Sequence, residues 1–147
     1  MKNAPSGDVS FVDVRGPRFA AWVTSAVLAV ALVLGSGQLV AAQAVVFAVG
    51  AFAGLRYAPY GVLFRVFVAP RLGPVREREP EAPPRFAQLV GLLFAVIGAA
   101  GYLLGAPAVG AVATGLALVA ALLNAATGFC LGCELYLIAR RAVPARI

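Results

Sequence analysis

The chain contains no histidine and only two cysteines, Cys130 and Cys133, among its 147 residues. A structural zinc site normally takes four ligands, and an iron-sulfur cluster is held by four cysteines. One copy of the chain falls short of either set, so a metal centre would need ligands shared across a dimer. We therefore expect no bound metal.

Charged side chains are also scarce: they make up 12% of the chain, whereas 62% of the residues are hydrophobic. A water-soluble domain of this length would not have enough polar surface. Four apolar runs are each about long enough to cross a hydrocarbon core of roughly 30 Å, at 19–36, 39–55, 86–104 and 108–127. Alternating β-barrel patterning is absent. The sequence therefore predicts an all-α integral membrane protein, a four-helix bundle.

The distribution of positive charge predicts the orientation of these spans. None of the 12 Lys and Arg residues lies in the short connections 35–38 and 105–107. All lie before the first span, between the second and third, or after the fourth, so the positive-inside rule places both termini and the central loop in the cytoplasm of a multi-pass cell-membrane protein. We attribute the net charge of +6 to topology and to anionic lipid head groups, and expect no nucleic-acid binding. Hydrophobicity continues past Ala44, so we expect no signal-peptide cleavage there.

The two halves of the chain look alike. Pro17-Arg18-Phe19-Ala20 introduces the first pair of spans, and Pro84-Arg85-Phe86-Ala87 introduces the second. This pattern predicts two parallel two-helix repeats, each followed by a short interfacial helix; chance similarity in a low-complexity sequence is the alternative. The expected units are a cytoplasmic segment (1–18), a first repeat (19–72, with its interfacial helix at 57–72), a cytoplasmic Pro- and charge-rich linker (73–84), a second repeat (85–141, with its interfacial helix at 129–141) and a tail (142–147).

The second repeat needs a break in its last helix. Residues 108–139 would extend roughly 48 Å as one straight helix, which is longer than the hydrocarbon core. Thr127-Gly128 is the expected break, and it would put Cys130 and Cys133 in the first turn of a new helix. The positive end of that helix dipole favours a thiolate, whereas a straight helix would place the cysteines near a C-terminus, which disfavours one.

We therefore consider Cys130 and Cys133 as candidate catalytic thiols, with two apolar side chains packed in a helix as the alternative. At a cytoplasmic membrane edge a permanent structural disulfide is not expected. Glu134 adjoins the pair; its charge disfavours a thiolate, but its carboxylate is a candidate for proton transfer during exchange. The candidate binding residues are Asn124, Thr127, Gly128 and Tyr136. For Asn124 and Thr127 an interhelical hydrogen bond is the alternative.

Several segments resemble a known family: VDVRGPRFAA (12–21), RYAPYGVLFR (56–65), APRLGP (69–74), PPRFAQ (83–88) and NAATGFCLGCELYL (124–137). Together they resemble the bacterial membrane family catalogued as domain of unknown function 4395, over about residues 12–141. The resemblance implies a small integral membrane protein associated with thioredoxin-like or sulfurtransferase proteins. Its two-plus-two helix plan is also similar to that of DoxX-like membrane proteins.

Three functions follow as hypotheses. The first is a membrane thiol-disulfide exchange or sulfur-relay component, which would need a quinone or a protein partner as electron acceptor because the chain has no second cysteine pair. The second is a membrane anchor or assembly subunit without chemistry of its own. The third is a transporter of a small sulfur species. The sequence leaves the oligomeric state open, a homo-oligomer included.

Overall fold

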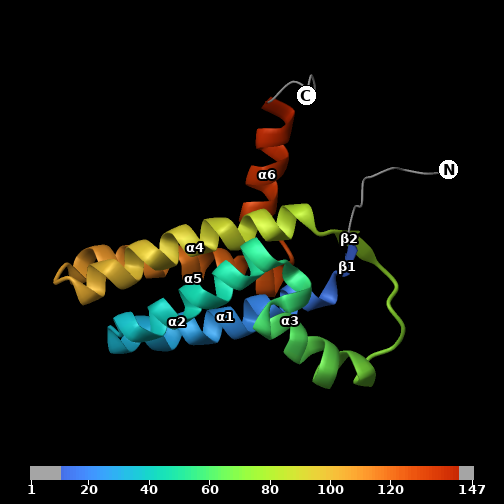
Figure 1. Ribbon diagram of the computed structural model, residues 1–147, viewed down its shortest axis with the longest axis horizontal. Coiled ribbons are helices and arrows are strands. Elements are labelled where there is room, and N and C mark those ends of the chain that lie inside the picture. The colour runs from blue at the N-terminus through green and yellow to red at the C-terminus, as the bar shows by residue number, and fades with distance from the viewer. Residues whose placement is uncertain (1–10, 143–147) are drawn as a thin grey trace.

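The computed structural model describes residues 11–142 as a helical bundle with shorter elements gathered at one end (Figure 1). The helical elements are α1 (Arg15–Leu34), α2 (Gly37–Ala48), η1 (Val49–Ala53), η2 (Leu55–Tyr57), α3 (Pro59–Leu63), η3 (Phe64–Val68), η4 (Ala69–Arg71), α4 (Ala82–Leu103), α5 (Pro107–Thr127) and α6 (Leu131–Ala142). Helices dominate this part of the chain, which confirms the all-α class. Most of the expected tail, 143–147, lies outside the described residues, as do residues 1–10 of the expected N-terminal segment.

Three of the helices, α1, α4 and α5, are long and apolar enough to cross a membrane by length and composition. Only 28%, 22% and 28% of their most apolar stretches is buried inside the bundle. Large apolar side chains of these helices therefore point outward, for example Val33 in α1 and Val119 in α5, which are 85% and 61% exposed. A soluble monomer rarely exposes so much contiguous apolar surface, so these helices indicate a lipid environment. The segment Gly37–Ala53, which is α2 continued by the π-helical turn η1, is apolar but shorter.

The bundle is held together by small residues and a few aromatic ones. Helix α4 packs against both α2 and α5, and α5 packs against α1. The buried cluster between α1, α2 and α4 consists of Ala31, Val40, Ala44, Phe47, Ala95 and Ala99. Gly101 lies directly against the backbone of Gly110, where a Cβ atom would overlap its amide nitrogen. Such close backbone approach is typical of helix association in membranes, where no hydrophobic effect drives helices together.

The segments expected as an N-terminal tail and a solvated linker contact each other. Strand β1 (Phe11–Asp13) pairs antiparallel with β2 (Arg78–Pro80), with Val12 opposite Glu79. Each strand has only three residues and no alternating pattern that could have predicted it. The pairing satisfies backbone groups that water would otherwise have to satisfy.

Asp13 connects this small sheet to the start of α1. Its carboxylate accepts hydrogen bonds from the backbone N–H of Arg15 at 3.0 Å and from the Arg15 guanidinium, of which the shortest is 2.8 Å. The side-chain hydrogen bond from Arg15 is the main reason that the pKa of Asp13 lies below its ordinary value. In β2, burial raises the pKa of Glu79, and the neighbouring charge of Glu77 adds to the effect.

Several element bounds differ from the sequence-based expectation. Helix α1 begins at Arg15 rather than residue 19, and α4 begins at Ala82 rather than residue 86. In both cases the helix extends about one turn beyond the apolar run, because helix formation does not require apolar side chains and proline is favourable in a first turn. The expected interfacial helix at 57–72 is divided into η2, α3, η3 and η4, with Pro59 at the start of α3.

Candidate functional site: the helix break and the cysteine pair

The last long helix ends where the length of the apolar run predicts. Helix α5 ends at Thr127, and Gly128 follows in the left-handed conformation with φ of 81°. Glycine suits this position because it has no Cβ atom to clash there. The Gly128 N–H donates to the Asn124 carbonyl at 2.8 Å. The chain then turns before α6 begins at Leu131.

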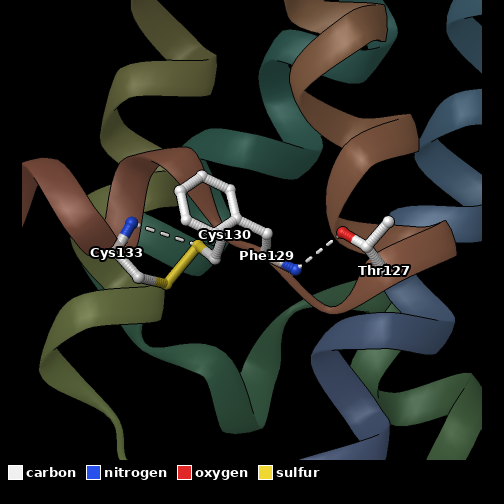
Figure 2. Close-up of a disulfide and its surroundings, with 4 residues drawn as sticks. All are labelled: Thr127, Phe129, Cys130 and Cys133. Atoms are coloured by element: carbon white, nitrogen blue, oxygen red, sulfur yellow. Dashed lines mark hydrogen bonds between the residues drawn. A yellow bond between two sulfur atoms is a disulfide. The ribbon is translucent and has the colours of Figure 1, made fainter.

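The hydroxyl of Thr127 stabilises this turn locally. It donates to the Leu123 carbonyl at 2.6 Å. It also accepts the Phe129 N–H at 3.2 Å, the bond drawn in Figure 2. The sequence left an interhelical hydrogen bond and a ligand contact as the two alternatives for Thr127; its two hydrogen bonds are local rather than interhelical, and the ligand contact stays a prediction. Its hydrogen-bonding capacity is used within the break.

An arginine from the first helix caps the end of α5. The Arg18 Nη2 donates to the carbonyls of Ala125 and Ala126 at 3.0 and 3.3 Å. The last carbonyls of a helix have no partner within that helix, so this guanidinium supplies one and adds a positive charge where the dipole favours it. From the sequence, Arg18 has a role only in membrane topology, and no pattern predicts this contact.

Arg85 makes the corresponding contact at the end of η1. Its Nη2 donates to the Ala51 and Phe52 carbonyls at 2.8 and 3.2 Å. These residues lie three and two positions before Gly54, whose φ is 113°. Ala125 and Ala126 have the same spacing before Gly128. Thus each Pro-Arg-Phe-Ala segment caps the second long helix of the other half of the chain.

The phenylalanines that follow these arginines also have matching contacts. The Phe19 ring lies 5.7 Å from that of Phe64 in η3, measured between centroids. The Phe86 ring lies 5.7 Å from that of Tyr136 in α6. The Phe19 ring therefore packs η3 against α1, and the Phe86 ring packs α6 against α4.

Cys130 and Cys133 lie at the start of α6 and are joined by a disulfide, with their Cα atoms 5.1 Å apart (Figure 2). The Cys130 carbonyl accepts the Glu134 N–H at 3.0 Å, and the Cys130 Sγ accepts the Cys133 N–H at 3.1 Å. Cys130 is therefore the N-cap residue of α6, with Cys133 in its first turn. Of the two geometries considered from the sequence, this is the one in which the helix dipole favours a thiolate.

The disulfide joins residues within a single helical turn and connects no distant parts of the fold. Loop-closure arithmetic gives it about 2 kcal/mol, less than half of what a loop of about 100 residues would give. A permanent structural disulfide is not expected from the sequence, and a crosslink this local stabilises the fold only weakly. It is the oxidised form that a cycling pair adopts.

Helix α6 runs past the start of α4 instead of continuing α5 (Figure 1). Gly132 makes this approach close: a Cβ atom there would lie 2.5 Å from both Cα and Cβ of Ala87. Tyr136, a candidate binding residue, packs against the Phe86 ring in a tilted arrangement and accepts a hydrogen bond from Arg140 at 3.0 Å. These contacts make Tyr136 part of the packing that orients α6.

The remaining candidates do not form an enclosed site. Glu134 is exposed, and within residues 11–142 neither its side chain nor that of Asn124 forms a hydrogen bond. Asn124, Thr127, Gly128, Cys130, Cys133, Glu134 and Tyr136 are all absent from the lining of the cavity described below. The same part of the chain contains no group of three or more His, Cys, Asp or Glu side chains placed to hold a metal ion. The candidate site is thus a half-buried disulfide at a helix N-terminus.

The break and the cysteine pair fall within a match to a known protein family. A family model matches residues 12–141, which include both halves of the bundle. The chain belongs to the family described as a domain of unknown function (DUF4395). Membership in DUF4395 assigns no activity to the pair. The similarity to DoxX-like proteins is not shown by this match and stays a prediction. Comparison with curated proteins and with solved structures gives no match.

Proposed function

We propose that the protein is a membrane component of thiol-disulfide exchange, in which Cys130 and Cys133 react with a cytoplasmic thioredoxin-like or sulfurtransferase partner. One observation carries the proposal: the Cys130 Sγ caps α6 and accepts the Cys133 N–H at 3.1 Å. In the reduced protein the same N–H and the helix dipole stabilise a Cys130 thiolate. Cys130 is therefore the attacking thiol, a choice that the sequence left open.

The reaction balances with a single partner. The Cys130 thiolate attacks a disulfide sulfur of the partner, forms a mixed disulfide and releases the partner's other sulfur as a thiolate. The Cys133 thiolate, after losing its proton, attacks the Cys130 sulfur, closes the intramolecular disulfide and releases the partner's second thiolate. Two electrons pass to the partner. A reduced partner dithiol reverses both steps, and Glu134 is the adjacent group for the proton.

Sulfur relay would use the same first residue. The Cys130 thiolate attacks the outer sulfur of a partner persulfide, which leaves a persulfide on Cys130 and returns the partner as a thiol. Neither reaction requires a cofactor in this chain when the partner carries the electrons. A membrane quinone as final electron acceptor stays a prediction.

The proposal includes a multi-pass membrane arrangement of two parallel repeats. The fourth span would be Gly37–Ala53, near the lower limit of about 17 residues for crossing a bilayer. The exchanged arginine caps and the two aromatic pairs support the repeat, because unrelated halves would have no reason to share these spacings. The hairpins between α1 and α2 and between α4 and α5 lie together at one end, away from α3 and the β1–β2 sheet (Figure 1). With every Lys and Arg outside those hairpins, both termini are assigned to the cytoplasm.

A non-catalytic anchor is the second candidate, and one observation favours it. On α6, Leu131, Leu135 and Ile138 are exposed, and no residue of the helix is buried. This stripe can lie on the membrane or bind a partner without thiol chemistry. The transporter of a small sulfur species stays a prediction, which no contact of Asn124 or Thr127 favours.

Trapping in cells distinguishes exchange from anchoring. A Cys133→Ser variant retains the attacking thiol but cannot resolve the mixed disulfide, so it should accumulate a covalent adduct that reductant removes. Cys130→Ser is the matched control and should accumulate much less. Adducts in neither variant would contradict exchange, and a partner that co-purifies equally with Cys130→Ala plus Cys133→Ala would establish the anchor instead.

A further inference from the structure

A cavity of about 520 Å³ lies away from the cysteine pair, between the start of α1, α3 with η3, and the β1–β2 sheet. These elements lie together at the end of the bundle opposite the hairpins (Figure 1). The volume is within the range of roughly 300–1,000 Å³ that is typical of small-molecule sites. Its walls are largely apolar, with Val46, Leu55 and Phe64 among the lining residues.

The lining residues also carry excess positive charge. Arg56, Arg65 and Arg78 line the cavity and are exposed, and none of them forms a salt bridge within residues 11–142. Asp13 is the only carboxylate among the described lining residues, and it is held by the Arg15 guanidinium. The described lining residues therefore include three arginines against one carboxylate, an excess of two positive charges.

The polar side chains at the cavity differ in whether they already form hydrogen bonds within the protein. The Tyr60 hydroxyl donates to Gln43 at 2.7 Å, and Gln43 in turn contacts the Thr24 hydroxyl at 3.5 Å. That chain of contacts is internally satisfied. Gln88 also lines the cavity, and its side-chain amide forms no hydrogen bond within the described part of the chain. A bound molecule would therefore meet the Gln88 amide, the apolar walls and an arginine edge formed by Arg56, Arg65 and Arg78.

We propose that this cavity binds an anionic phospholipid, with the phosphate at the arginine edge and the first part of an acyl chain against the apolar walls. Guanidinium groups suit phosphate because they donate several hydrogen bonds in a planar fork. An apolar chain alone, or a neutral quinone, would make no use of the arginines. The inference rests on the membrane arrangement proposed above but not on the thiol chemistry.

Native mass spectrometry of the detergent-solubilised full chain tests this site. Phosphatidylglycerol, phosphatidylcholine, inorganic phosphate and a short-chain naphthoquinone are added separately at equal concentration. We expect phosphatidylglycerol to bind most tightly. The Arg56→Gln plus Arg78→Gln variant should weaken its binding about five-fold for each charge removed. The control Arg71→Gln plus Arg141→Gln removes the same charge from exposed residues outside the cavity lining and should retain wild-type binding.

A second variant tests the apolar part of the site. Ala20→Leu enlarges a side chain that lines the cavity and should weaken phosphatidylglycerol binding without changing the cationic edge. Equal binding of the two phospholipids would overturn the proposal, as would equal loss in the control variant. If inorganic phosphate binds as tightly as the lipid, the cavity is an anion site to which the acyl chain contributes no affinity, and the phospholipid proposal is wrong. If the naphthoquinone binds more tightly than phosphatidylglycerol, and the arginine substitutions leave its affinity unchanged, the cavity is a quinone site instead. Appearance of the protein in the soluble cell fraction would instead refute the membrane arrangement.

Discussion

Replacing Gly132 by alanine tests whether close packing of α6 on α4 holds the cysteine pair in position. The new methyl carbon would lie 2.5 Å from both Cα and Cβ of Ala87, a distance at which backbone atoms must move. Overpacking typically costs about 1–3 kcal/mol. The better helix propensity of alanine offsets up to about 1 kcal/mol of that. Because the obstacle includes backbone, we expect a net loss of about 1–2 kcal/mol in the free energy of unfolding.

The assay is reversible unfolding by SDS titration in mixed micelles, with Gly115→Ala as the matched control. Gly115 also lies inside a helix, but no atom comes within 4 Å of a Cβ placed there. That variant should be neutral or more stable by up to about 1 kcal/mol. Wild-type stability of Gly132→Ala, or equal destabilisation of both variants, would refute the packing assigned to α6.

Two further predictions concern charged side chains. Arg18→Gln and Arg85→Gln each remove hydrogen bonds from a charged donor to the end of a helix, so each should lower the free energy of unfolding, measured by SDS titration, by about 1.5–3 kcal/mol. Only Arg18→Gln should change the alkylation rate of Cys130. Equal changes of that rate in the two variants would contradict a local role for Arg18. The Asp13–Arg15 pair should contribute only modestly to the free energy of unfolding, because solvent screens an ion pair at the surface. Because the pKa of Asp13 is lowered in the folded state, this contribution is fully present above the ordinary value of about 3.9 and is lost as pH falls through the lower folded value. The stability difference between wild type and Asp13→Asn should therefore shrink on acidification, and a difference that does not change with pH would disprove the assignment.

The long helices and the break could be predicted from the sequence for simple physical reasons. The thickness of a bilayer limits the length of a span, so the excess length after residue 108 required an interruption, and Thr127-Gly128 was the local signal for it. Helix α5 ends at Thr127, and Cys130 begins the next helix. The N-terminal position of the cysteine pair followed from these two facts.

Contacts between distant segments could not be predicted in the same way. The Pro-Arg-Phe-Ala repeat is visible in the sequence. The positive-inside rule accounts for the positions of its arginines without requiring any contact, so the sequence did not predict that Arg18 and Arg85 cap helix ends. The β1–β2 pairing joins two three-residue segments that are separated by seven helical elements, and no periodicity indicates it. Within 57–72, α3 and η3 pack against α1, a contact between distant segments that the sequence likewise does not indicate.

The central claim is that Cys130 is a working thiol activated by the start of α6. The most direct measurement is the rate of alkylation at neutral pH of reduced Cys133→Ser, which retains Cys130, against reduced Cys130→Ser, which retains Cys133. Both side chains are half-buried, so exposure alone favours neither. We predict that Cys130 reacts faster than Cys133 and faster than an ordinary exposed thiol. If Cys130 reacts no faster than Cys133 and no faster than an ordinary exposed thiol, it is not activated, and the proposed role in thiol-disulfide exchange is wrong.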